Sequence, residues 1–347
     1  MKKIHFYSSL IITLFLGIII FFIKKNNISL FSSNSFLTNF QNFSQLKIIL
    51  IHFIAFFSLI YLIFSFFDYL KTLSQKKIIY QAFSKYVNIA QYFLKNPTHI
   101  KLGGENKYVT VYFLDIKNFS KILKDYESHI VDYLNEYFSA MSAIIFKNQG
   151  IVDKYDGDAI MAFWGTPEKQ KNQALLACET ALEQQKSLKQ LRKKWKKENK
   201  PEIYADISIV TGNMMVGNIG SKNYLNYTLI GENVNIGFEL EKINTIYKTE
   251  ILVGENTYKE AKSEYVFREI DEIQIKDFNK TKIFELLDKK ENIEAKQKEL
   301  IENYTQALKS YRAKKYEEAK KFVNNCLRIY PNDTPSILLK EKILKEK

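Results

Sequence analysis

The stretch IVDKYDGDAIMAFWG, residues 151–165, decides the fold, because an Asp-Gly pair at its centre separates two runs rich in apolar residues. Such a pair between apolar runs is the strongest short signal for a β-hairpin. Upstream, YVTVYFL at residues 108–114 is typical of a buried strand. Amphipathic helices are predicted over about residues 128–146 and 168–198, and the strand IYADISIV follows at 203–210. The order strand, helix, hairpin, helix, strand predicts an α+β domain with a ferredoxin-like split βαβ core.

The remainder of this domain is predicted from shorter signals. TGNMMVGNIG at residues 211–220 is typical of a strand bounded by glycines. A helix is expected over about residues 233–245, and short strands near 250–253, 265–270 and 282–287 complete the domain.

Composition limits the function classes. The chain has 347 residues, 51 of them Lys or Arg and 38 Asp or Glu, so its formal charge is +13. Two cysteines exclude a disulfide framework, and four scattered histidines share no ligand spacing for zinc. Residues 1–101 hold 11 basic residues and one acidic residue, Asp68, whereas the rest holds 40 basic and 37 acidic residues. Because the excess flanks apolar runs and not a folded module, it favours a membrane partner and argues against nucleic acid.

Two apolar runs predict transmembrane helices within residues 1–67. Residues 4–23 and 48–67 are each about 20 residues long, enough to cross a hydrocarbon core of about 30 Å. The first run has no small-residue cleavage site after it, so we interpret it as an anchor and not as a signal peptide. The joining loop, 24–47, is too short for a ligand-binding domain.

Lysines after the second run favour both termini on the inner side. We therefore expect a multi-pass protein of a bacterial inner membrane with its soluble domain in the cytoplasm. Residues 68–101 carry spaced apolar positions and are expected to form a linker helix that ends at Asn96-Pro97.

Two aspartates are the first candidates for chemistry. Asp115 ends the strand at 108–114, and Asp158 starts the second arm of the hairpin. If these strands are neighbours, both carboxylates meet at one edge of the sheet and suit Mg²⁺ that is held together with substrate phosphates. Free N–H groups of the helix that follows Asp115 suit a polyphosphate. The alternative is that both are ordinary turn residues at strand ends.

Three stretches carry a family resemblance. KYVNIAQYFLKNPTHIKLGGENKYVTVYFLDIKNFS at 85–120, DKYDGDAIMAFWGTP at 153–167 and VGNIGSKNYLNYTLIGENVNI at 216–236 resemble, in this order, signature stretches of the class III adenylate/guanylate cyclases. The resemblance covers about residues 80–287. It implies a homodimer with two sites at its interface that converts ATP to cyclic AMP and pyrophosphate.

The resemblance also implies roles for single residues. Asp115 and Asp158, with the carbonyl of Ile116, would hold two Mg²⁺ or Mn²⁺ ions per site. Phe119 and Ser120, at the start of the following helix, would bind the substrate polyphosphate.

Three further positions match the nucleoside-binding half of a cyclase site. Lys154 and Thr228 match the two base-reading positions, and guanine-selective members carry an acidic residue where Lys154 stands, so ATP is favoured over GTP. Asn235 matches the asparagine that orients the ribose and the transition state.

Some positions depart from the family pattern. Glu239 stands where the family has an arginine that contacts the α-phosphate in the transition state, and Gly237 and Phe238 replace small residues beside it. Asn118 stands where the family often has Gly in the phosphate-binding turn. Loss of such a cation can cost several orders of magnitude in rate.

We therefore predict a slow adenylate cyclase, one that recruits another basic residue such as Lys242 or Lys222, or one that needs a complete partner. The alternative is a degenerate nucleotide-binding or regulatory module without catalysis. A cyclic-dinucleotide synthase is disfavoured, because the hairpin turn Tyr155-Asp156-Gly157-Asp158 lacks that family's Gly-Gly-Asp/Glu-Glu-Phe motif.

The last part of the chain is expected to be a helical tail. We place the catalytic domain at residues 102–290 and the tail at 291–347. YTQALKSYRAKKYEEAKKFVNNCLRIYPND, residues 304–333, resembles one tetratricopeptide-like helical pair. A single such pair cannot bury its apolar face alone, so the tail is predicted to pack on the catalytic domain or on a dimer mate.

Overall fold

The chain divides into two compact units, Met1–Tyr80 and Gln81–Lys347. The computed structural model describes residues 36–86, 102–126, 129–221, 223–275 and 280–346, together with positions 89, 92, 93, 96 and 98. The expected first membrane span, 4–23, lies outside the described residues.

The described part of the first unit belongs to one long helix, α2 (Phe36–Tyr86), of 51 residues, whose last six residues are in the second unit. The expected loop over 24–47 is therefore wrong in its second part, because helix already begins at Phe36. The physical reason is that residues 36–47 contain neither Gly nor Pro to interrupt a helix. Helix α2 is described as far as Tyr86, Tyr92 and Phe93 are helical as well, and several positions that bear on the expected end at Asn96-Pro97 lie outside the described residues.

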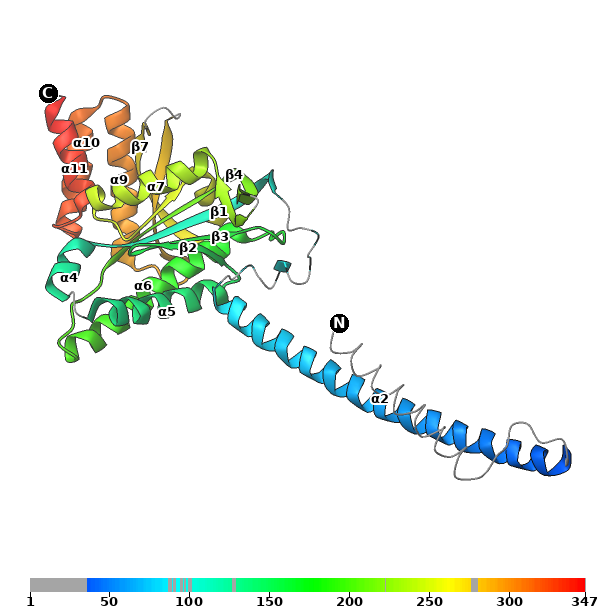
Figure 1. Ribbon diagram of the computed structural model, residues 1–347. Helices are drawn as coiled ribbons and strands as arrows, with labels where there is room; N and C mark the ends of the chain where they lie inside the picture. Colours follow the sequence, from blue (N-terminus) through cyan, green and yellow to red (C-terminus); the bar gives the residue numbers. More distant parts are fainter. Residues whose placement is uncertain are drawn as a thin grey trace. The chain divides into compact units, whose positions relative to one another are not determined.

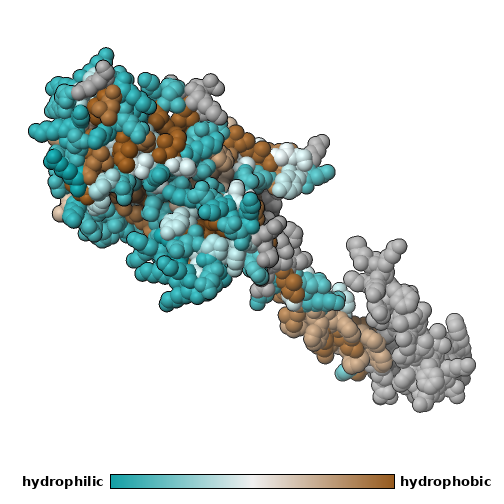
Figure 2. Space-filling view, turned by 90° about the vertical axis from the view of Figure 1, so that its left-hand side faces the viewer, coloured by the Kyte–Doolittle hydropathy of each residue, from teal (hydrophilic) through white to brown (hydrophobic). Residues whose placement is uncertain are grey.

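Within the described residues, one helical stretch is long and apolar enough to cross a membrane, Leu50–Ile78, with a mean hydropathy of 2.3. Its large apolar side chains are exposed, such as Ile51, Phe56 and Phe64. Figure 2 shows them as a brown band on the described part of this helix, while the surface of the second unit is mostly teal. An apolar exposed surface of this kind needs an apolar partner.

The second unit contains an eight-stranded mixed sheet (Figure 1). Seven strands lie in the order β2-β3-β1-β4-β6-β8-β7, and β5 pairs with β4 outside this path. The strands are β1 (Gly103–Ile116), β2 (Ile151–Asp156), β3 (Ala159–Trp164), β4 (Ala205–Ser221), β5 (Tyr224–Ile230), β6 (Ile251–Gly254), β7 (Tyr265–Ile273) and β8 (Thr281–Lys289).

The helices of this unit follow the strands along the chain. They are α4 (Phe119–Tyr126), α5 (Ile130–Lys147), α6 (Gln173–Lys197), α7 (Glu232–Tyr247), α8 (Glu255–Ala261), α9 (Ala295–Arg312), α10 (Tyr316–Ile329) and α11 (Thr334–Lys345). The strand order β4-β1-β3-β2, with α5 and α6 as the connecting helices, is the split βαβ arrangement that the sequence predicts.

Strand β1 lies at the centre of the unit because both of its faces are apolar. Its residues alternate between the two faces, as they must in a strand. Tyr112 and Leu114 pack in one core cluster with α5 and α6, whereas Val111 and Phe113 pack in a second cluster with α7. Figure 1 accordingly shows α5 and α6 on one side of the sheet and α7 on the other. Asp115, next after Leu114, is the first polar residue at the end of this buried run.

Three elements differ from the sequence prediction. The two strands expected over 203–210 and 211–220 are one strand, β4, since Gly212 only provides room for Asn233; a Cβ on Gly212 would lie 2.5 Å from the Asn233 amide nitrogen. Strand β5, which carries Thr228, and helix α8 were not predicted. Strand β5 pairs only with the distal part of β4 and is too short to give a periodic signal by itself.

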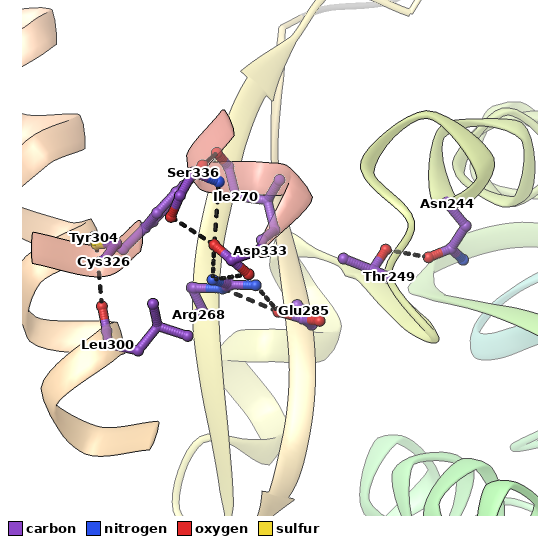
Figure 3. Close-up of polar contacts among 10 residues, drawn as sticks. All are labelled: Asn244, Thr249, Arg268, Ile270, Glu285, Leu300, Tyr304, Cys326, Asp333 and Ser336. Carbon is purple, nitrogen blue, oxygen red and sulfur yellow. Dashed lines mark hydrogen bonds and ion pairs between the residues drawn. The ribbon is translucent and has the colours of Figure 1, made fainter. Parts of the chain in front are cut away.

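The tail consists of three helices, α9, α10 and α11, with their own apolar cluster. It packs on strand β7, where the Tyr304 hydroxyl donates to the Ile270 carbonyl at 2.8 Å. Arg268 of β7, 3% exposed, donates to Glu285 of β8 and to Asp333 at the start of α11 (Figure 3). This buried network joins the tail to the edge of the sheet.

Candidate active site

Asp115 and Asp158 meet at the edge of the sheet. Strands β1 and β3 pair with Leu114 opposite Ile160, and continuing this register places Asp158 opposite Ile116. Both carboxylates lie close to the backbone of Ile116, which lowers the pKa of each and opposes the effect of burial. The hairpin reaches this position because Gly157 adopts a φ of 62°, the left-handed region that favours glycine. The two aspartates are therefore neighbours beside the backbone of Ile116.

Both carboxylates titrate far above the usual range of aspartate. Burial raises the pKa of Asp115 to about 7, with the charge of Glu241 and a hydrogen bond to Glu241 as further causes. Burial and then the charge of Asp115 raise the pKa of Asp158 to about 6. Two half-buried carboxylates that repel each other form a donor set that a divalent cation would neutralise.

Two further acidic side chains, which the sequence did not single out, belong to this cluster. Glu241 of α7 contacts Asp115, and burial raises the pKa of Glu241 as well. Asp206 of β4 lies opposite Asp115 in the β1–β4 register and pairs with Lys117 at 2.5 Å. Glu241 follows the buried positions of its helix at helical spacing, and this was the signal that could have revealed it.

The residues present fit a divalent cation, but not as a complete ligand set. Within the described part of the chain, no group of three or more His, Cys, Asp or Glu side chains is arranged to hold a metal ion. Asp115 and Asp158 supply two carboxylates, and Mg²⁺ characteristically completes such a set with waters and substrate phosphates. A metal bound here would thus depend on water or on a phosphate-bearing ligand for part of its coordination.

The turn that follows Asp115 adopts a left-handed conformation without glycine. Asn118 has a φ of 56°, and asparagine tolerates this left-handed conformation better than most residues. Helix α4 begins at the next residue, and the first N–H groups of a helix, here those of Phe119 and Ser120, have no intrahelical partner. The Phe119 ring packs against the core, whereas Ser120 is exposed.

Lys154 and Thr228 are brought together by a residue that the sequence did not predict. The ammonium of Lys154 lies 3.3 Å from Asp153, and the Thr228 hydroxyl donates to the same carboxylate oxygen at 2.9 Å. Strands β2 and β5 are not neighbours in the sheet, so this contact connects them. Among the described residues, no hydrogen bond or ion pair joins Lys154 or Thr228 to the Asp115–Asp158 pair.

Helix α7 carries Asn235 and Glu239 one turn apart, on the same face. Asn235 is exposed in the first turn, directly after Gly231, whose φ of 146° only glycine adopts readily. Glu239 is paired with Lys242 at 3.0 Å. The other basic residue considered as a replacement cation, Lys222, lies outside the described residues.

Comparison with known proteins identifies the fold described above. Residues 104–288 match the family model of the adenylate and guanylate cyclase catalytic domain, more than half of the chain. The chain belongs to this family. The matched segment of this cyclase-family chain coincides with the sheet from β1 to β8 and so includes both aspartates of the candidate site.

Individual relatives point the same way. The chain is 30% identical over 161 residues to adenylate cyclase 1 of Rhizobium meliloti and 27% identical over 248 residues to the terminal-differentiation-specific adenylate cyclase of Dictyostelium discoideum. These matches cover 46% and 69% of this chain but only 24% and 11% of the relatives. The crystal structure of the adenylyl cyclase CyaB from P. aeruginosa is similar over 56% of this chain and 100% of that one, with 30% identity and a TM-score of 0.51.

Proposed function

We propose that this chain is a membrane-anchored adenylate cyclase that converts ATP to 3′,5′-cyclic AMP and pyrophosphate as a homodimer. In this reaction the ribose 3′-oxygen attacks the α-phosphorus, the bond to the oxygen that bridges to the β-phosphate breaks, and pyrophosphate leaves. The observation that carries the proposal is the convergence of Asp115 and Asp158 at the edge of the sheet, beside Ile116, within the cyclase fold. Relatives named as adenylate cyclases support it.

We propose that Asp115 and Asp158 hold Mg²⁺ or Mn²⁺, with help from the Ile116 carbonyl. When bound, two such ions would stabilise the charge on the polyphosphate and favour ionisation of the attacking hydroxyl. The two carboxylates would hold these ions, and the N–H groups of Phe119 and Ser120 would bind the phosphates of the nucleotide. The raised pKa values of both aspartates support this role, because perturbed carboxylates gather at functional sites.

We propose that Lys154 and Thr228 bind the adenine edge and that Asn235 orients the ribose. Lysine only donates hydrogen bonds, and the adenine edge offers a ring nitrogen that accepts and an amino group that donates. Among the described residues, no hydrogen bond or ion pair joins this group to the Asp115–Asp158 pair, and the family resemblance favours a site shared by two copies. One copy would then supply the aspartates and the other would supply the base-binding residues.

The charge of Glu239 supports the proposal that turnover is slow. A carboxylate near the α-phosphate repels the charge that develops in the transition state, whereas the arginine of other family members would attract it. Its ion pair with Lys242 reduces this repulsion and brings an ammonium to the same face of α7. The same substitution favours the second candidate function, a nucleotide-binding regulatory module without turnover.

The membrane part of the proposal rests on α2. The apolar, exposed stretch Leu50–Ile78 is long enough to span a bilayer at 1.5 Å per residue. With the expected span over 4–23 it would form the multi-pass anchor of a bacterial inner-membrane protein.

The experiment is a product assay on the full chain in detergent or lipid, with Mn²⁺ and ATP or GTP side by side. We expect cyclic AMP above the level of an Asp115→Ala control, and less cyclic GMP. ATP binding without product, at high enzyme concentration, would favour the regulatory module. Absence of both binding and product would refute the proposed function.

A further inference from the structure

A buried carboxylate, Asp153, lies behind the two proposed base-reading residues. Strands β2 and β3 shift their register between Val152 and Lys154, so Asp153 is the additional residue of a β-bulge. A bulge re-aims side chains, and it explains how two consecutive residues, Asp153 and Lys154, come within 3.3 Å of each other on one face. Without the bulge, consecutive side chains would point to opposite faces of the sheet.

The contacts of Asp153 are concentrated on one oxygen. Its side chain is 0% exposed, and Oδ2 accepts from both Lys154 and Thr228. The other oxygen, Oδ1, is buried and has no hydrogen-bond partner among the residues that the structure describes. Burial raises the pKa of Asp153, and the charge of Lys154 and the hydrogen bond from Thr228 oppose this effect. A buried carboxylate with an unpartnered oxygen is costly, so its retention calls for a functional reason.

The contact with Asp153 fixes what Thr228 can offer to a ligand. A threonine hydroxyl has one proton, and when this proton is donated to Oδ2, only lone pairs remain on the other side. Lys154, in contrast, has three protons and keeps donors free after its contact with Asp153. The two side chains therefore present one donor and one acceptor, in fixed positions.

This pattern distinguishes the purines. The adenine edge offers the N6 amino donor beside a ring acceptor, which complements a Thr228 acceptor and a Lys154 donor. Guanine instead carries the O6 acceptor at the corresponding position, and O6 would meet the lone pairs of Thr228. An unrestrained threonine hydroxyl could rotate and donate to O6, so Thr228 alone would not discriminate strongly.

We propose that Asp153 is a positioning residue that selects adenine over guanine by orienting the hydroxyl of Thr228 and the ammonium of Lys154. The inference rests on the proposed function, since it assumes that Lys154 and Thr228 read the base. It goes further in assigning the preference to a residue that does not touch the nucleotide. A purely structural role, in which Asp153 only joins β2 to β5, would weaken ATP and GTP binding equally.

The test compares the ATP/GTP ratio of affinities for Asp153→Ala in the full chain. The probes are non-cyclisable α,β-methylene analogues of both nucleotides with Mn²⁺, so that a low turnover does not matter, and the kcat/KM ratio is measured where product forms. We expect the ratio to fall about tenfold, the value of one lost base contact. Asp132→Ala, an exposed aspartate on α5, is the matched control and should leave the ratio unchanged. Asp153→Leu serves the same purpose if the alanine variant does not fold.

A double-mutant cycle separates positioning from simple destabilisation. Thr228→Val should lower the ratio about as much as Asp153→Ala, and the two changes together should lower it little further, because the discrimination against the guanine O6 acts through the Thr228 hydroxyl. Asp153→Asn, which keeps a carbonyl acceptor, should retain most of the preference. A wild-type chain that prefers ATP and an Asp153→Ala variant with the same ratio would overturn this inference alone. A wild-type chain without any preference for ATP would overturn the proposed adenine specificity together with it.

Discussion

Replacement of Glu239 by arginine should accelerate the reaction. Glu239 lies one turn after Asn235 on α7, and its carboxylate now pairs with Lys242 at 3.0 Å. An arginine at this position restores the cation that the family places near the α-phosphate. Its guanidinium would bind phosphate oxygens with two parallel hydrogen bonds, which Lys242 cannot imitate.

The size of the effect follows from the charge change. Coulomb's law gives about 4 kcal/mol for two unit charges at about 4 Å and an effective dielectric constant of about 20. The Glu239 side chain is 23% exposed, and its charge is partly compensated by Lys242. We therefore take about half of this Coulomb energy. A gain of about 2 kcal/mol in the transition state corresponds to roughly a 30-fold higher kcat. KM should change little, because the contact forms mainly in the transition state.

The assay is the initial rate of cyclic AMP formation by the full chain at saturating ATP and Mn²⁺. Glu239→Gln, which removes the negative charge without adding a cation, should give a smaller gain of about fivefold. Glu299→Arg on the exposed surface of α9 makes the same change in net charge and should leave the rate unchanged. A folded Glu239→Arg protein with an unchanged or lower kcat would show that the role assigned to position 239 is wrong.

Three other perturbations test the remaining parts of the structure. Asp158→Asn should lower cyclic AMP formation at least a hundredfold and abolish the thermal stabilisation by Mn²⁺, whereas a metal response like that of wild type would exclude it as a ligand. Because the folded-state pKa values of Asp115 (about 7) and Asp158 (about 6) exceed the ordinary 3.8, the folded protein binds extra protons between about pH 4 and 7. Without metal, Tm should therefore fall as the pH rises from about 5 to 8, and the Mn²⁺-induced rise in Tm should grow over the same interval; flat profiles would contradict this. Arg268→Leu leaves Glu285 and Asp333 as uncompensated buried carboxylates, so it should cost about 3–5 kcal/mol and release the tail to proteolysis, while a wild-type Tm would refute the structural role of the network.

The convergence of the two aspartates could be expected from the sequence because it depends on local signals. An apolar strand that ends in Asp115 and an Asp-Gly hairpin before Asp158 are both short-range patterns. The split βαβ order then makes the two strands neighbours. Geometry that follows from strand order and turn chemistry is thus within reach of sequence reasoning.

The side chains that contact these residues could not be predicted from the sequence, because their positions depend on tertiary packing. Glu241 approaches Asp115 only because α7 lies across the end of β1, and Asp153 reaches Thr228 only through a bulge in β2 and the course of β5. The sequence of a six-residue strand such as β2 does not reveal a bulge, since the β2–β3 pairing could continue with or without one extra residue. The three-helix tail was predicted as a pair for a similar reason, because α11 is held by Asp333, which pairs with Arg268 more than sixty residues earlier.

Two of the positions on α7 that depart from the family pattern, Gly237 and Phe238, pack together against the same ring of β1. The Phe113 ring lies where a side chain at position 237 would be, since a Cβ on Gly237 would come within 2.4 Å of it. Phe238 packs on the same ring at 4.2 Å, and the Ser208 hydroxyl donates to the Gly237 carbonyl at 2.7 Å. A large residue at 113 therefore requires glycine at 237, and this exchange lets α7 stay close to β1. These contacts hold α7 against β1 and β4. The departure that matters for catalysis is therefore the side chain of Glu239, and a single substitution at this position should suffice to test its role.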